Sequence, residues 1–185
     1  MIGRVLVTVA AGVVAVSCSS GPGGPQFGVP DGEAIQQLVA DYAAAYSIQD
    51  VDALEAMFSG TVTLMPPNSS TVRGRESAAG FFSALFANVQ PELELESTER
   101  GGAGGLAFAQ GTYRTITQVP VATEGDGEDD ENGEDDDENA DEAEVEMTES
   151  RDRGKWLLLA RKLAGQWRIE HLIWSSDLPP STDEN

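Results

Sequence analysis

One acidic segment divides this chain and limits what it can fold into. Residues 124–149 hold 16 of the 32 Asp and Glu residues and contain no Lys or Arg. With this charge and no aromatic side chain, the segment buries too little apolar surface to offset the entropy that ordering would cost. We therefore predict a disordered, solvated insert at about residues 123–150, with folded chain on both sides of it.

The charge of the remaining chain excludes one large class of partners. Outside the segment, 16 acidic residues stand against 11 Lys and Arg, which is an ordinary balance. No basic patch offsets the acidic segment, which would repel phosphate groups, so nucleic-acid binding is excluded. An EF-hand is excluded too, because its loop needs Asp first and Glu twelfth, where Glu128 and Asn139 stand. Weak multivalent binding of Ca²⁺, or of a basic partner protein, stays open as an alternative role for the insert.

The beginning of the chain predicts export and a membrane anchor. Arg4 precedes an apolar run from Val5 to Val16 that is too short to span a bilayer comfortably. The following Cys18, after Ala15-Val16-Ser17, resembles the lipobox at which bacterial lipoproteins are cleaved and lipid-modified. We predict a signal peptide at residues 1–17 and lipid attachment at Cys18. The alternative is an ordinary signal peptide cut nearby.

A tether follows the predicted lipid site. Residues 18–30 are mostly Gly, Pro and Ser, which is typical of a flexible linker. The predicted location is the bacterial cell envelope, outside the cytoplasm, with the membrane contacted through the lipid on Cys18. Ser19, instead of Asp, would direct the protein to the periplasmic face of the outer membrane in a Gram-negative cell.

Between the tether and a C-terminal tail at residues 180–185, the hydrophobic period changes from helical to strand-like. Apolar residues recur every three or four positions between Asp31 and Ser47, then again in two shorter segments. The predicted helices are residues 31–47, 51–58 and 76–89, and the predicted strands are residues 61–65, 92–96, 106–119, 155–163 and 166–175. Helices before strands predict one α+β domain at residues 31–179, with three N-terminal helices packed on a curved, mainly antiparallel sheet.

Several short motifs, in this order, resemble a known family. They are Gln49-Asp50-Val51-Asp52-Ala53-Leu54, Leu64-Met65-Pro66-Pro67-Asn68, Val72-Arg73-Gly74-Arg75-Glu76, Gly154-Lys155-Trp156, Gly165-Gln166-Trp167-Arg168-Ile169 and Ile173-Trp174-Ser175-Ser176-Asp177. Together they resemble SnoaL-like, ketosteroid-isomerase-like members of the nuclear-transport-factor-type superfamily. The resemblance implies a cone-shaped half-barrel, a pocket between sheet and helices, and a homodimer. It implies no single function, because isomerases, cyclases, dehydratases and binding proteins share this fold.

The resemblance also implies where a catalytic base would stand. Ketosteroid isomerases use an Asp base just before a proline, and the matching residue here is Met65, whose thioether cannot accept a proton. Many relatives carry a polar residue two positions before the final tryptophan, where this chain has Leu172. Both positions predict an apolar pocket that lacks the usual base.

The remaining candidates each have a structural interpretation as well. His171 is the single imidazole and could act as a base, but on a regular strand it would share a face with Trp167 and Ile169 beside the core. Tyr42 and Tyr46 lie one helical turn apart and could direct hydroxyls into a pocket or pack in the core. Trp174 is the tryptophan expected to touch a ligand or a partner. The predicted pocket-lining residues are Tyr42, Tyr46, Met65, Leu172 and Trp174.

These observations favour a lipid-anchored domain that binds a small apolar or amphipathic molecule without catalysis. The first alternative is an isomerase, cyclase or dehydratase that uses His171 with Tyr42 or Tyr46. The second is a structural, dimeric envelope module. No cofactor is predicted, and one His and one Cys exclude a multi-His or Cys-cluster metal site.

Overall fold

The computed structural model describes residues 26–87, 89–120 and 147–179. The predicted signal peptide, Cys18 and most of the tether lie outside these ranges, as do the greater part of the acidic insert and the C-terminal tail. Among the described residues, no helix is long and apolar enough to cross a membrane.

The first helix, α1, runs from Val29 to Ser47 and begins two residues before its predicted start. Asp31 is therefore inside the first turn, where its carboxylate accepts a hydrogen bond from the Gly28 backbone N–H at 3.0 Å. An acidic group at this position stabilises the positive end of the helix dipole. One face of the helix is buried as its period predicts, through Ile35, Leu38, Val39, Tyr42 and Ala45.

Two shorter helices complete the helical layer. α2 runs from Val51 to Met57, and the Asp50 carboxylate accepts the Ala53 backbone N–H at 2.9 Å, which is the predicted cap. α3 runs from Arg75 to Phe86 and buries Phe82, whose ring centroid lies 5.9 Å from that of Phe58. These contacts tie α3 to the first strand.

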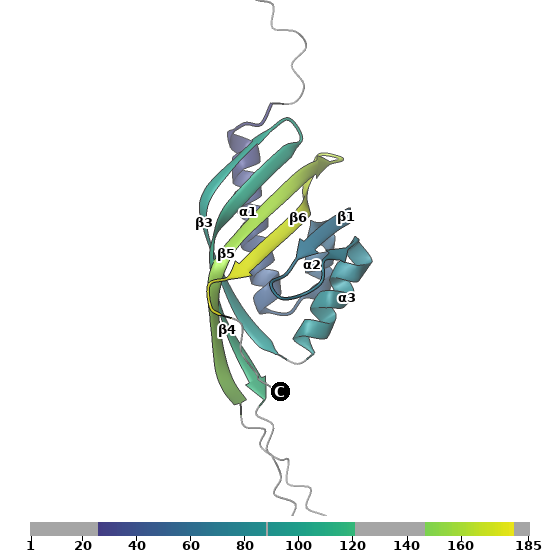
Figure 1. The fold of residues 1–185 in the computed structure, drawn as a ribbon. Helices are drawn as coiled ribbons and strands as arrows, with labels where there is room; N and C mark the ends of the chain where they lie inside the picture. The colour runs from purple at the N-terminus through teal and green to yellow at the C-terminus, as the bar shows by residue number, and fades with distance from the viewer. Residues whose placement is uncertain (1–25, 88, 121–146, 180–185) are drawn as a thin grey trace, which may run out of the picture.

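Six strands form one sheet in the order β2-β1-β6-β5-β4-β3. They are β1 (Phe58–Met65), β2 (Val72–Arg73), β3 (Gln90–Ala103), β4 (Leu106–Pro120), β5 (Met147–Leu163) and β6 (Gln166–Ser176). All neighbours are antiparallel except β1 and β6, which run parallel. The sheet is curved and open, and the helices lie on its inner side (Figure 1). The predicted α+β class and its three helices on a curved, mainly antiparallel sheet are confirmed.

The β4–β5 pair extends further than the sequence predicted. β5 begins at Met147, inside the range predicted for the insert, and pairs residue by residue with β4 as far as Pro120. Charged residues occupy this part of β5, so its strand character depends on pairing with β4 rather than on its own hydrophobicity.

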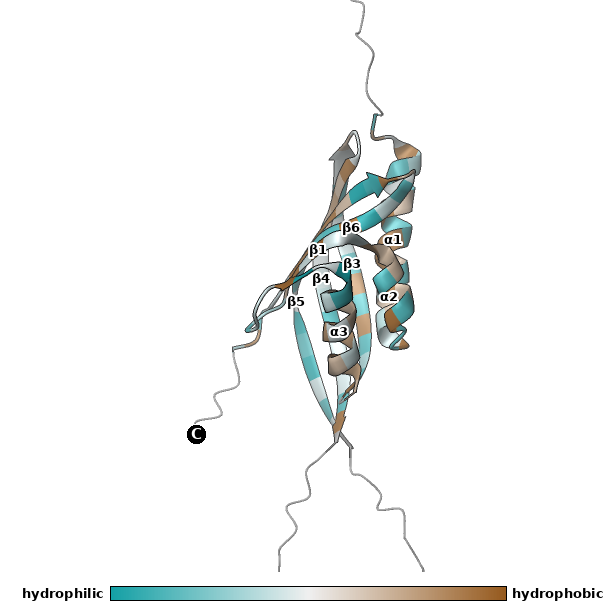
Figure 2. Cartoon of the chain, turned by 90° about the vertical axis from the view of Figure 1, so that its right-hand side faces the viewer, coloured by the Kyte–Doolittle hydropathy of each residue, from teal (hydrophilic) through white to brown (hydrophobic). Residues whose placement is uncertain are grey.

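The core lies between the helices and the inner face of the sheet. Buried apolar side chains of α1 and α3 belong to one cluster with those of the strands, and Figure 2 shows these helices lying along one face of the sheet. The fully buried members include Ile35, Leu54, Phe58, Phe82 and Ile169. This arrangement leaves the middle of α1 facing four neighbouring strands, and the candidate site lies there.

Candidate functional site

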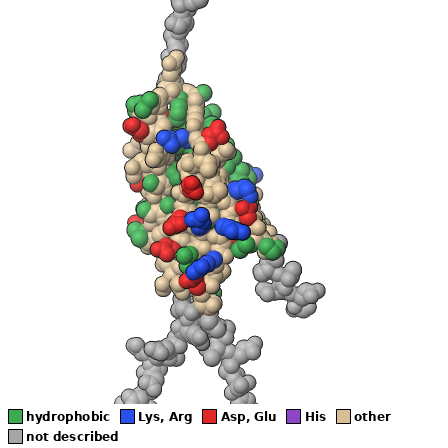
Figure 3. All heavy atoms as spheres, turned by 90° about the vertical axis from the view of Figure 1, so that its left-hand side faces the viewer, with side chains coloured by type: hydrophobic (Ala, Val, Ile, Leu, Met, Phe, Trp, Pro, Cys, Tyr) green, Lys and Arg blue, Asp and Glu red, His purple; other side chains and the backbone are tan. Residues whose placement is uncertain are grey.

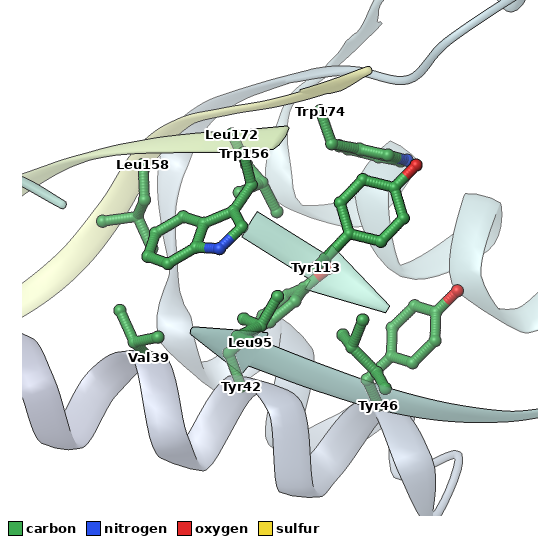
Figure 4. Close-up of a pocket in the computed structure, with 10 residues that line it drawn as sticks. Val39, Tyr42, Tyr46, Leu95, Tyr113, Trp156, Leu158, Leu172 and Trp174 are labelled. Atoms are coloured by element: carbon green, nitrogen blue, oxygen red, sulfur yellow. The ribbon is translucent and has the colours of Figure 1, made fainter. Parts of the chain in front are cut away.

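A cavity of about 60 Å³ lies between α1 and the inner face of the sheet. It is lined by Val39, Tyr42 and Tyr46 of α1, Leu93 and Leu95 of β3, Tyr113 of β4, Trp156 and Leu158 of β5, and Leu172 and Trp174 of β6. The α1 side chains face those of the strands across the cavity (Figure 4). Aliphatic and aromatic groups therefore make up nearly the whole wall.

The structure brings most of the predicted pocket residues together. Tyr42, Tyr46, Leu172 and Trp174 all line the cavity. Met65 does not. It follows Leu64, which is in register with the cavity residue Leu172, and successive residues of a strand point to opposite faces. The position at which the resemblance implies a base therefore faces away from the cavity.

His171 also stands on the outer face, and a β-bulge in β6 is the reason. Leu159 pairs with His171, but the next residue, Ala160, pairs with Ile169, so Glu170 is an extra residue in β6. The extra residue reverses the alternation of side chains. Trp167 and Ile169 face inward before the bulge, and Leu172 and Trp174 face inward after it. The prediction that His171 shares a face with Trp167 and Ile169 is wrong for this reason.

The side chain of Glu170 is held in place at the bulge. Thr61 donates its hydroxyl to one carboxylate oxygen at 3.0 Å, and Arg161 donates Nε–H to the other at 3.2 Å. These two contacts join β1, β5 and β6 at one point. The bulge is thus part of what sets the inner wall of the cavity.

Tyr113 is one of six lining residues that the sequence analysis did not predict, the others being Val39, Leu93, Leu95, Trp156 and Leu158. Tyr113 follows Ala107, Ala109 and Gly111 at every second position of β4. This row of small residues is buried, so Tyr113 is the first large side chain on its face. An alternating row of small residues that ends in an aromatic one is the signal that could have identified it.

The Tyr113 hydroxyl donates a hydrogen bond to Oδ2 of Asp152 at 2.7 Å. The other oxygen of Asp152 accepts from the hydroxyl of Ser176 at 2.6 Å and from the Arg153 backbone N–H at 2.7 Å. Tyr113 lines the cavity while Asp152 is only half-buried, so this network connects the apolar wall with solvent.

The titratable groups of the cavity wall are three tyrosines. Burial raises the pKa of Tyr46 to about 12 and raises the pKa of Tyr42 well above 10. Burial, with the Asp152 carboxylate next to it, raises the pKa of Tyr113 as well. All three hydroxyls therefore stay protonated near neutral pH, where they can donate hydrogen bonds but cannot act as bases.

No arrangement for a metal ion is found in the described part of the chain. There, no three His, Cys, Asp or Glu side chains are grouped so that they could hold one. The chemistry that this site supports is therefore apolar contact with a few hydrogen bonds.

Comparison with known families gives one clear match. Residues 39–156 match the SnoaL-like domain family, and they include most of the cavity wall. A comparison with curated proteins finds no match.

Solved structures with the same fold come from several bacteria. A ketosteroid isomerase-like protein from Erwinia carotovora atroseptica is 19% identical, with a TM-score of 0.60 over 80% of this chain and 96% of its own. A nuclear transport factor 2-like superfamily protein from Salmonella enterica is 14% identical, with a TM-score of 0.59 over 83% and 95%. A protein with a cystatin-like fold from Caulobacter vibrioides is 19% identical, with a TM-score of 0.58 over 80% and 90%. At these identities the likeness establishes the fold alone.

Proposed function

The chain belongs to the SnoaL-like domain family, and we propose that its domain binds a small apolar or amphipathic molecule without acid–base catalysis. The observation that carries the proposal is the cavity wall, in which aromatic and aliphatic side chains of five elements converge. Burial of an apolar group against such a wall is the main driving force available to it.

The size of the cavity restricts the ligand. A volume of about 60 Å³ is well below the roughly 150 Å³ of an engineered protein cavity that holds benzene. The cavity therefore suits a short alkyl group rather than a ring system. An amphipathic molecule would place such a group inside and keep its polar end at the opening.

The absence of a usable base argues for binding rather than turnover. The tyrosine hydroxyls on the wall keep their protons near neutral pH. His171 lies in register with Thr63 and Leu159, one residue out of phase with Leu172, so it faces away from Tyr42 and Tyr46. We therefore favour binding over the isomerase, cyclase or dehydratase alternative.

Xenon tests the cavity without requiring knowledge of the ligand. The full-length chain would carry Cys18→Ser, so that no lipid can occupy the cavity. Xenon should shift the methyl resonances of Leu158 and Leu172 in this protein. Leu172→Phe should abolish the shift by filling the space, and Leu157→Phe on the outer face should leave it unchanged. Loss of the shift in both variants, or in neither, would contradict the proposal.

We also propose that the domain is anchored to the cell envelope by lipid on Cys18. Support comes from the sequence, where the single cysteine follows an apolar run and precedes a Gly- and Pro-rich tether. Radiolabelled palmitate should enter the wild-type chain, which should sediment with membranes. Cys18→Ser should remove both properties, whereas Ser19→Ala should retain them. A labelled Cys18→Ser chain would overturn the anchor.

A second copy of this chain is the partner that we propose for the outer face of the sheet. A groove of about 510 Å³ there contains acidic Glu92 and Glu94 of β3 beside Arg114, Arg151 and Arg153 of β4 and β5. Acidic and basic side chains also lie side by side on this face in Figure 3. A two-fold rotation would place the acidic row of one copy on the basic row of the other.

Light scattering tests the dimer. Replacing Arg114 and Arg153 with Glu should leave a monomer, and adding Glu92→Lys and Glu94→Lys should restore the dimer by reversing both rows. This interface would be excluded if the wild type were a monomer at all concentrations, or if the variant with Glu at positions 114 and 153 were still a dimer.

A further inference from the structure

Asp152 is a carboxylate that accepts a hydrogen bond from a side chain of the cavity wall. It is half-buried and accepts three hydrogen bonds, from Tyr113, Ser176 and the Arg153 backbone N–H. None of the described ion pairs includes it. The neighbouring residues Arg151 and Arg153 alternate to the outer face of the strand, and neither forms an ion pair with Asp152, although all three border the outer groove.

A second, independent observation lies beside Asp152. Thr115 is its direct neighbour across the β4–β5 pair. The Thr115 hydroxyl oxygen is buried and has no hydrogen-bond partner within the described ranges. An unpaired buried hydroxyl costs free energy, and native proteins usually supply a partner to such a group, often a bound molecule or water. Thr115 and Asp152 occupy paired positions on the same face of β4 and β5, so one bound group could serve both side chains.

Gly154 leaves room for the Tyr113 ring between the cavity and the carboxylate. It lies between Trp156 and Asp152 on the inner face of β5, opposite Tyr113. Because Gly154 has no side chain, the Tyr113 ring crosses it and reaches Asp152 with its hydroxyl. Trp174 and Ser176 border the same place from β6. The apolar cavity and the carboxylate are thus separated only by the tyrosine ring.

From this geometry we propose that Asp152 receives the positively charged head of the ligand, a protonated amine, while its short alkyl tail fills the cavity. The proposal rests on the proposed function and adds the chemical class of the ligand. A protonated amine supplies the opposite charge that Asp152 lacks, and its spare N–H can be given to the Thr115 hydroxyl. A carboxylate head would be repelled, and an alcohol would gain no charge attraction.

Three probes with one common tail test this choice. They are n-butylamine, n-butanol and butanoate, titrated into the full-length Cys18→Ser chain and followed by the methyl resonances of Leu158 and Leu172. The amine should bind at least tenfold more tightly than the alcohol, and butanoate should cause no shift. Raising the salt concentration should weaken amine binding and leave alcohol binding unchanged, because only the amine depends on charge.

Variants then assign the effect to Asp152. Asp152→Asn should reduce amine affinity about tenfold and leave alcohol affinity within twofold. Asp41→Asn is the matched control, because Asp41 is exposed on α1 and accepts a hydrogen bond from Gln37, and it should change neither affinity. If Asp152→Asn fails to fold, the salt dependence of the unchanged protein still decides the question.

The outcomes separate this inference from the proposed function. The amine site would be overturned if amine and alcohol bound equally well, or if neither salt nor Asp152→Asn changed amine binding. In both cases the proposal of an apolar cavity would be unaffected. If xenon and all three probes fail to shift the methyl resonances, the proposed function itself is overturned.

Discussion

Tyr113 lies directly opposite Gly154 in the β4–β5 pair, and its ring covers the place where a side chain at Gly154 would stand. A Cβ atom at position 154 would lie 2.8 Å from Cε1 of Tyr113 and 1.9 Å from the backbone oxygen of Ser175. The ring can bend away, but the β6 backbone cannot do so without breaking its pairing. Residue 154 is therefore required to be glycine by contact rather than by backbone angle.

We expect Gly154→Ala to destabilise the domain by at least about 2 kcal/mol, because backbone overlap in a packed sheet is costly. Gly80→Ala is the matched control, since no atom lies within 4 Å of its added Cβ and it occupies an exposed position of α3. That change should stabilise by up to about 1 kcal/mol through helix propensity. Urea unfolding measures both, and equal effects of the two substitutions would contradict the contact explanation.

Tyr113→Phe should cost about 1.5 kcal/mol, because the half-buried Asp152 loses one of its three donors. Tyr46→Phe provides the comparison, since burial alone acts on the Tyr46 hydroxyl and no hydrogen bond to it is seen among the described residues. Its removal should change the free energy of unfolding by less than about 0.5 kcal/mol. Chemical denaturation of both variants tests the difference. If Tyr46→Phe lost more free energy of unfolding than Tyr113→Phe, the hydroxyl that stabilises the domain would be that of Tyr46 on α1.

Asp31 should make the domain sensitive to acid. Hydrogen bonds from Lys162 at 2.6 Å and from the Gly28 N–H hold the pKa of Asp31 below its ordinary value of 3.8. The stabilisation is therefore fully present above pH 3.8 and is lost as the pH falls through the lowered pKa. Asp31→Asn should lower the Tm at pH 6. Below pH 4, the Tm of this variant should decrease less with falling pH than the Tm of the wild type. Asp41→Asn, on the exposed side of α1, should leave the acid profile unchanged.

Leu172→Ala should destabilise the domain by about 2–5 kcal/mol and enlarge the cavity, because Leu172 is buried in its wall. The added space should admit benzene, which should raise the Tm of this variant and not that of the wild type. Ile173 lies on the outer face, so benzene should not raise the Tm of Ile173→Ala. A benzene-induced rise in the wild-type Tm would mean that the cavity is already larger than the structure indicates.

The three helices and five of the six described strands could be predicted from local sequence, and the two-residue strand β2 could not. The three- and four-residue spacing in α1, the Asp50 cap and the alternation in β3 act over a few residues, and they depend on backbone geometry that every chain shares. Tyr42 and Tyr46 reach the cavity because they lie one turn apart on the buried side of α1, and that period is visible in the sequence.

Tertiary structure decided which residues of the last strand face the cavity. The extra residue at Glu170 reverses the side-chain alternation, so His171 faces outward while Leu172 and Trp174 face inward. A bulge depends on pairing with β1 and β5, which are distant in sequence, so no local period reveals it. The contact between Tyr113 and Asp152 likewise requires the β4–β5 register across the acidic insert. Residue spacing determined the helices and most of the strands of this protein, whereas long-range pairing determined β2, the first part of β5 and the site.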